Sequence, residues 1–262
     1  MEKLSKLENY AEEIRRDIFK MIVGIGGGHF GGSYSCVEIL LTMYMEILTK
    51  KDKFVLSKAH ASATLYSVLS KKKIIDSNLL ETYGKDGSCL GVHAESHLVN
   101  GIEFSCGSLG HGLSYSAGLA LGKKLKNEEG RISVLIGDGE SQEGSIWEAA
   151  MFSSQHNLDN LIAIVDYNKI QSMGRLKNII NLEPLAKKWE SFGWNVLEVN
   201  GHDYSALIKA FNQVQKTKDK PNMIIAHTKK GKGLSLIEDK YDCHYYRPNE
   251  KDIQIAEKEL KI

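Results

Sequence analysis

Short apolar runs bounded by glycine or polar residues constrain the fold of this chain most. Residues 131–136 are rich in isoleucine, valine and leucine, and they stop at Gly137-Asp138-Gly139. Residues 161–165 form a second such run, followed by Asp166-Tyr167-Asn168. Strand and helix patterns continue to alternate, with predicted strands at 194–199 and 222–226 and predicted helices at 145–156 and 204–215. Apolar strands that alternate with helices predict an α/β fold, a doubly wound and mostly parallel sheet with helices on both faces.

The first half of the chain has the pattern of helices around one short strand. Apolar residues recur at spacings of three and four over residues 4–21, as in an amphipathic helix, and a glycine cluster follows at 24–28. Further helices are predicted at 36–48, 61–69 and 113–125, and a strand at 53–56. Ser145 and Glu148 fit an S-x-x-E capping box that would open the helix over 145–156. With three prolines and no internal repeat, residues 1–262 are expected to form a single domain.

Charge and composition exclude several classes of protein. The 34 basic and 33 acidic residues give a net charge of +1, whereas nucleic-acid-binding domains usually carry an excess of positive charge. The sequence has no apolar run long enough for a membrane span, and its N-terminus lacks the apolar core of a signal peptide. We therefore expect a cytoplasmic protein without a nucleic-acid or membrane partner. The four cysteines are scattered without a C-x-x-C pair, which favours packing over metal binding or disulfide formation.

Polar residues at the ends of two neighbouring strands predict a binding site. Ligands of doubly wound sheets lie beyond the carboxyl ends of the strands, where Asp138 and Asn168 would stand side by side. Oxygen ligands of this kind suit Mg²⁺ shared with the phosphates of a bound molecule. The glycines at 137 and 139 would let backbone N–H groups approach a phosphate. Taken alone, Gly-Asp-Gly is also typical of a simple turn after a strand.

The spacing of these residues resembles a known motif. Residues 137–144, continuing to 166–171, are similar to the thiamine-diphosphate motif of transketolases. The resemblance implies that Asp138 and Asn168 bind a divalent metal through their side chains and that Ile170 adds its backbone carbonyl. The metal, Mg²⁺ or in its place Ca²⁺ or Mn²⁺, would bridge the diphosphate of the cofactor thiamine diphosphate.

Four histidines fall in order within segments that resemble transketolase motifs. His29 lies in G-H-F-G-G-S, His60 ends F-V-L-S-K-A-H, His93 lies in G-V-H-A-E, and His244 follows Cys243 where the family has W-H. A lone histidine is more often a core or surface residue, but imidazole suits repeated proton transfer near neutral pH. The resemblance implies that His29 and His244 move protons near the reacting carbon. It places His60 close to the diphosphate and lets His93 hydrogen-bond the donor ketose.

Two further elements of the family complete the expected site. Residues 104–112 resemble T-G-S-L-G-Q-G, in which the backbone lies against the cofactor; the alternative is a glycine-rich loop before a helix. Glu143 would belong to a carboxylate network at the subunit interface, or would simply be an exposed glutamate at a helix start, and both interpretations stay open. The expected catalytic residues are His29, His60, His93, His244 and Glu143. The expected cofactor-binding residues are His60, Gly107, Ser108, Leu109, Gly137, Asp138, Gly139, Glu143, Asn168 and His244.

A second glycine motif is rejected as a nucleotide site. Residues 26–31 fit G-x-G-x-x-G, the dinucleotide fingerprint. That fingerprint follows a strand, whereas here an amphipathic helix precedes it. No nicotinamide site is therefore expected.

The resemblance extends over residues 5–250 and covers only the first domain of transketolases. It implies the N-terminal subunit of a split transketolase, which transfers a two-carbon ketol unit between sugars and is active only with a partner subunit. The partner would be a C-terminal subunit with the pyrimidine-binding domain, in an α₂β₂ assembly. The alternatives are a non-catalytic scaffold subunit, or another thiamine-diphosphate enzyme of the keto-acid decarboxylase or deoxyxylulose-phosphate synthase type. The sequence departs from the family motifs, mostly around the donor and thiazolium side, at Phe30, Ala59, Ala94, His111 and Met173.

Overall fold

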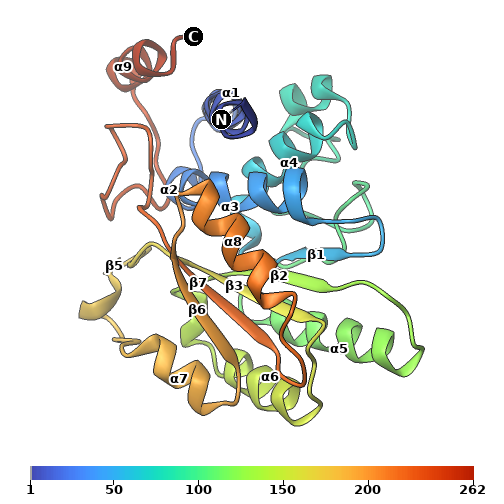
Figure 1. Ribbon diagram of the computed structural model, residues 1–262. Coiled ribbons are helices and arrows are strands. Elements are labelled where there is room, and N and C mark those ends of the chain that lie inside the picture. The colour runs from blue at the N-terminus through green and yellow to red at the C-terminus, as the bar shows by residue number, and fades with distance from the viewer. Residues whose placement is uncertain (1) are drawn as a thin grey trace.

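A five-stranded parallel sheet forms the centre of the computed structural model, which describes residues 2–262 (Figure 1). The strand order is β1-β2-β3-β7-β6, and every neighbouring pair is parallel. The bounds are β1 Lys53–Leu56, β2 Ile132–Gly137, β3 Leu161–Tyr167, β6 Asn195–Asn200 and β7 Asn222–His227. A small antiparallel hairpin of β4 (Ile170–Gln171) and β5 (Gly174–Arg175) follows β3. The predicted mostly parallel α/β sheet is confirmed.

Helices cover both faces of this sheet (Figure 1). On one face lie α1 (Glu2–Gly24), α3 (Val37–Thr42), α4 (Ser62–Lys71) and α8 (Tyr204–Val214). On the other lie α5 (His111–Leu125), α6 (Gly144–Gln155) and α7 (Leu185–Ser191). Side chains alternate between two cores: in β2, Leu135 faces the first core, and Val134 and Ile136 face the second. Because both strand faces are buried, the central strands are predominantly apolar.

Shorter elements complete the chain. They are α2 (Phe30–Ser35), α9 (Glu250–Leu260), a π-helical turn (Met43–Ile47) and 3₁₀ turns at Ala59–Ala61, Ser77–Thr82, Glu140–Gln142 and Leu176–Asn178. Helix α9 lies beside α1, where Arg16 donates to the carbonyl of Leu260 at 2.7 Å (Figure 1). No helix within residues 2–262 combines the length and apolar character needed to cross a bilayer. The four cysteines are free, and three of them are buried.

The helix predicted at 36–48 is confirmed over residues 37–47, where α3 continues directly into the π-helical turn at Met43–Ile47. One local prediction is wrong. Ser145 and Glu148 form no capping box: Glu143 occupies the N-cap of α6, without a side-chain cap. The hydroxyl of Ser145 donates instead to the carbonyl of Gly110, at 2.9 Å. A partner distant in sequence thus replaces the local one that the pattern suggested.

The packing of α5 on the end of β1 gives a testable prediction about stability. A Cβ added at Gly112 would lie 2.9 Å from Cα of Ser57, a contact that the backbone must relieve by moving. We expect Gly112→Ala to lower the free energy of unfolding by about 1–3 kcal/mol, measured by urea denaturation. Gly118, in the same helix, has no atom within 4 Å of an added Cβ. Gly118→Ala is the matched control and should raise stability by about 0.5–1 kcal/mol; equal effects of the two changes would contradict this packing.

Candidate cofactor site

The carboxyl ends of four strands bring the predicted site residues together. Asp138 follows β2 and Asn168 follows β3, and these two strands pair directly, with Gly137 opposite Asp166. His60 follows β1, the strand paired with β2 on its other side, and Lys230 follows β7, which pairs with β3. The polar side chains therefore gather at one edge of the sheet, as the parallel topology requires.

Asp138 is a buried carboxylate with only neutral donors on its oxygens. It is 3% exposed and accepts the N–H groups of Gly139, at 2.7 Å, and of Lys169. Burial, followed by the nearby charge of Asp166, raises the pKa of Asp138 to about 7. A cation bound to this carboxylate would favour its ionised form and so lower the pKa of Asp138, against the effects of burial and of Asp166. The site is thus chemically suited to hold a positive charge.

Asn168 and Ile170 lie in the tight turn that follows β3. The amide oxygen of Asn168 accepts the N–H of Ile170 at 3.1 Å, and Lys169 between them has a left-handed backbone with φ of 66°. Within residues 2–262, no group of three or more His, Cys, Asp or Glu side chains is placed to hold a metal ion by itself. One carboxylate with amide and carbonyl oxygens fits Mg²⁺, which usually keeps few protein ligands and shares phosphate oxygens.

Lys230 is a member of the site that the sequence analysis missed. It is 2% exposed, and its ammonium donates to the carbonyl of Ile170 at 2.8 Å and to Nδ1 of His244 at 3.1 Å. Burial lowers the pKa of Lys230 to about 8. The ammonium therefore holds the one backbone carbonyl that was predicted to bind the metal. Its position after an apolar strand, in a segment with Gly231 and Gly233, was the available signal.

The four predicted histidines come together from four separate segments. The ring centroid of His29 lies 5.4 Å from that of His60, 5.8 Å from that of His93 and 5.3 Å from that of His244. Burial is the main cause that lowers the pKa of His29 to about 4 and that of His244 to about 3. It also lowers the pKa of His60 well below 6.5. His29, His60 and His244 are therefore neutral near pH 7, so each of these three imidazoles can both accept and donate a proton.

The hydrogen bond to Lys230 also decides the tautomer of His244. An ammonium can only donate, so Nδ1 of His244 accepts, and its ring proton lies on Nε2. His244 therefore presents an N–H donor on the side of the ring away from Lys230. The ring of Tyr245 stands perpendicular to His29 at 5.2 Å and closes another side of this histidine cluster.

Two neighbouring glutamates have different environments. Glu143, predicted as a site residue, is exposed at the start of α6. Glu140, not predicted, is buried and accepts from the hydroxyl of Ser57 and from the N–H groups of Gly110 and Gly137, both at 2.9 Å. Glu140 thereby ties the loop before α5 to the Gly-Asp-Gly turn. In that loop, residues 107 and 108 are exposed and residue 109 is half-buried.

The departures from the family motifs fall into two groups. Phe30, Ala59 and Ala94 are at most 2% exposed, and Phe30 packs against Phe19 and Tyr34 in the first core. The expectation that these changes surround the donor side is wrong for Phe30, because its ring belongs to the core. His111 and Met173 are exposed, and Met173 is 84% exposed.

This fold, with oxygen ligands, glycines and histidines gathered at the carboxyl edge of a parallel sheet, defines the class of cofactor-dependent α/β enzyme domains. Residues 8–261 match the family described as "Transketolase, thiamine diphosphate binding domain", and the chain belongs to this family. Thiamine diphosphate is accordingly its cofactor.

Relatives of known name match over nearly their whole length. The chain is 38% identical to one subunit of the apulose-4-phosphate transketolase of Phocaeicola vulgatus, over 97% of this chain and 93% of the relative. It is equally similar to the 6-deoxy-6-sulfo-D-fructose transketolase subunit SqwG of a Clostridium species, over 97% of this chain and 96% of the relative. The solved transketolase of Campylobacter jejuni superposes with a TM-score of 0.90 at 30% identity, over 98% of this chain and 43% of that one.

Proposed function

We propose that this chain is the thiamine-diphosphate-binding subunit of a two-chain transketolase. The enzyme transfers a two-carbon ketol unit from a ketose or ketose phosphate donor to an aldose acceptor. The observation that carries the proposal is the convergence of four histidines, from four segments, beside Asp138 and Asn168. A site that only bound a diphosphate would not need this cluster of imidazoles. The relatives matched nearly end to end, which are named as transketolase subunits, support the same assignment.

The metal and diphosphate would bind at the ends of β2 and β3. Asp138 and Asn168 would provide side-chain oxygens to Mg²⁺, or to Ca²⁺ or Mn²⁺, and Ile170 its carbonyl. The ammonium of Lys230 donates to that carbonyl at 2.8 Å and would also give the site a cationic donor for a phosphate oxygen. Gly137 and Gly139, with residues 107–109, would lie against the cofactor.

The histidines would carry the proton transfers. Bound thiamine diphosphate stabilises the carbanion that forms when the carbon–carbon bond breaks. His29 and the Nε2–H of His244 would exchange protons with substrate oxygens, since both rings are neutral near pH 7. His60, whose pKa burial lowers well below 6.5, would lie at the diphosphate, and His93 would hydrogen-bond the donor sugar.

The cofactor site would be completed by a partner subunit. The chain spans 43% of the length of the solved Campylobacter jejuni transketolase, and the rest of the site would come from a C-terminal subunit with a pyrimidine-binding domain. Glu143, exposed at the start of α6, would meet that subunit and join a carboxylate network there. We propose a cytoplasmic α₂β₂ assembly and a single domain for this chain. A scaffold subunit would not need Asp138, Asn168 and His29 in one place.

Calorimetry tests this proposal. Thiamine diphosphate with Mg²⁺ is titrated into the chain alone and into its complex with the pyrimidine-domain subunit. We expect binding that appears or tightens sharply in the complex and disappears with a chelator. The loaded complex should then transfer ketol units within a panel of ketose donors and aldose acceptors. Absence of binding in both preparations, or full turnover by this chain alone, would contradict the two-chain assignment.

A further inference from the structure

A fully buried ion pair lies directly behind the two metal-binding side chains. Lys58, 1% exposed, follows β1, and Asp166, 0% exposed, lies in β3 two residues before Asn168. The ammonium of Lys58 donates to a carboxylate oxygen of Asp166 and to the carbonyl of Gly32, at 2.9 Å. Burying two charges largely offsets their attraction, so such a pair contributes little net stability. Its position beside the site suggests another role.

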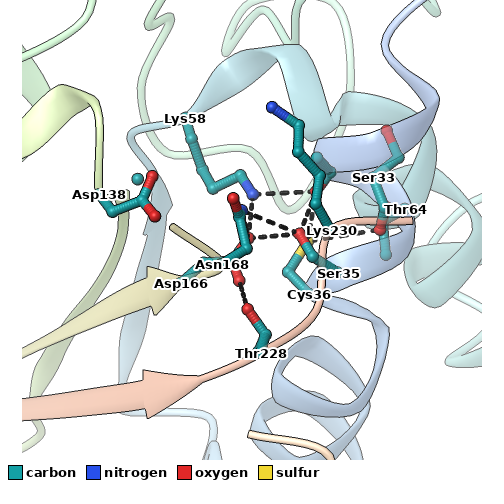
Figure 2. Close-up of polar contacts among 12 residues, drawn as sticks. Ser33, Ser35, Cys36, Lys58, Thr64, Asp138, Asp166, Asn168, Thr228 and Lys230 are labelled. Atoms are coloured by element: carbon teal, nitrogen blue, oxygen red, sulfur yellow. Dashed lines mark hydrogen bonds and ion pairs between the residues drawn. The ribbon is translucent and has the colours of Figure 1, made fainter. Parts of the chain in front are cut away.

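Donors from three segments converge on the carboxylate of Asp166 (Figure 2). Ser35 of α2 donates its hydroxyl at 2.6 Å to the oxygen that Lys58 also contacts. Thr228, which follows β7, donates its hydroxyl to the other oxygen. Both oxygens act as acceptors, as expected of an ionised carboxylate. The side chain of Asp166 thus connects three segments: helix α2, the segment after β1 that carries Lys58, and the segment after β7 that carries Lys230.

The same carboxylate fixes the amide orientation of Asn168. The Nδ2 group of Asn168 lies 3.3 Å from Asp166 Oδ2 and 3.5 Å from Ser35 Oγ, whereas its Oδ1 accepts the N–H of Ile170. A reversed amide would set two acceptor oxygens against each other at one end and two N–H donors at the other. Both ends therefore select one orientation. It places the amide oxygen at the 168–170 turn, whose Lys169 N–H also binds Asp138.

We propose that Asp166, with Lys58 as its counter-charge, is the positioning residue of the metal site. It holds the side-chain amide of Asn168 so that the oxygen, and not the NH₂ group, lies at the proposed metal position beside Asp138. An amide oxygen is a suitable ligand for a hard cation, whereas an NH₂ group is not. Through Thr228 it also anchors the start of the segment that ends in Lys230. This inference rests on the proposed function, because it concerns the same metal–diphosphate site.

Two variants separate positioning from stability. Asp166→Asn removes the charge at constant shape, leaves Lys58 buried without a counter-charge and places one amide against another. Lys58→Met/Asp166→Asn removes both charges and keeps the volume of the lysine stem, so its melting temperature should return close to that of the wild type. Loss of a group that orients a metal ligand typically costs 10- to 100-fold in affinity.

The measurement is thiamine diphosphate binding to the complex with the partner subunit, titrated over a range of Mg²⁺ concentrations, together with thermal unfolding. We expect both variants to bind the cofactor about 10- to 100-fold more weakly and to need more Mg²⁺ for half-maximal binding. The matched control is Lys124→Met/Asp159→Asn, which removes an ion pair far from the site, at the opposite edge of the sheet, and should change neither the affinity nor the Mg²⁺ requirement.

Three outcomes would overturn the inference. If the double variant regains both melting temperature and cofactor affinity, the pair serves only stability. If Asp166→Asn binds the cofactor with wild-type affinity, Asp166 does not orient Asn168. If the wild-type complex shows no Mg²⁺-dependent binding, the proposed function fails, and the inference fails with it. Wild-type binding with unaffected variants therefore contradicts the inference alone.

Discussion

Asp138→Ala is expected to abolish Mg²⁺-dependent binding of thiamine diphosphate while the protein stays folded. Asp138 is the only metal-binding group of the proposed set that carries a charge, since Asn168 and Ile170 contribute neutral oxygens. Its removal leaves a divalent cation without a protein anion in a buried position. Changes to residues that merely orient metal ligands cost 10- to 100-fold, so loss of the ligand itself should exceed about 100-fold in affinity.

The fold should survive this change because the metal-free carboxylate costs stability. Burial and Asp166 raise the pKa of Asp138 from 3.8 to about 7, so the folded chain holds this proton more tightly than the unfolded chain. The ionised group therefore lowers the free energy of unfolding progressively as the pH rises from 3.8 towards 7. At pH 8 without metal, Asp138→Ala removes that cost, and its melting temperature should not fall far below that of the wild type.

Calorimetry and thermal unfolding at pH 8, with and without Mg²⁺, measure both parts of this prediction. Asp86→Ala, which changes an exposed loop aspartate, is the matched control and should bind the cofactor as the wild type does. Thiamine diphosphate should raise the melting temperature of the wild-type and Asp86→Ala complexes but not that of Asp138→Ala. Unchanged affinity in Asp138→Ala would show that the metal assignment is wrong.

The sheet could be predicted because its central strands, β2 and β3, are buried on both faces. The runs at 131–136 and 161–165 are mostly apolar for that reason, and the residues that follow them form the edge of the sheet where the site lies. Asp138 and Asn168 were predictable because each stands directly at a strand end. The capping box at Ser145 failed because the carbonyl of Gly110, 35 residues away in sequence, takes its hydroxyl. Local patterns do not reveal such distant partners.

The residues that sequence reasoning missed share this dependence on distant partners. Lys58 and Asp166 are separated by 108 positions, and Lys230 and Ile170 by 60. A lysine or aspartate beside a strand end is ordinary in sequence, and only the assembled fold shows that each is buried and paired. The pairing of charges across the sheet thus required the structure.

The glycine cluster at 24–28 has a structural role that the sequence did not reveal when the dinucleotide-binding interpretation was rejected. A Cβ at Gly27 would lie 2.7 Å from the carbonyl of Tyr246 and 2.6 Å from Cγ of Arg247, and Gly28 forms a β-bridge with Tyr246. The glycines therefore allow two backbone segments to touch. That contact brings His29 beside His244, so the motif rejected as a nucleotide site builds the histidine cluster instead.

His29→Asn should lower turnover by about 10²- to 10⁴-fold and leave cofactor affinity within about threefold of the wild type. The ring of His29 lies within 6 Å of those of His60, His93 and His244, and its lowered pKa keeps it neutral and able to exchange protons. Asparagine keeps a polar, uncharged side chain but cannot exchange a proton near neutral pH. The steps that move protons on substrate oxygens should slow, while the metal and diphosphate contacts persist.

Turnover per bound cofactor in the complex with the partner subunit is the relevant measurement. His156→Asn, at the exposed end of α6, is the matched control and should leave turnover unchanged. If His29→Asn instead lost cofactor affinity with normal turnover per bound cofactor, His29 would be a binding group and not a proton-transfer group. Opposite phenotypes for Asp138→Ala and His29→Asn would divide the site into a half that holds the cofactor and a half that acts on the substrate. If neither change affected an active complex, catalysis would reside elsewhere, and the scaffold interpretation would account for this chain better.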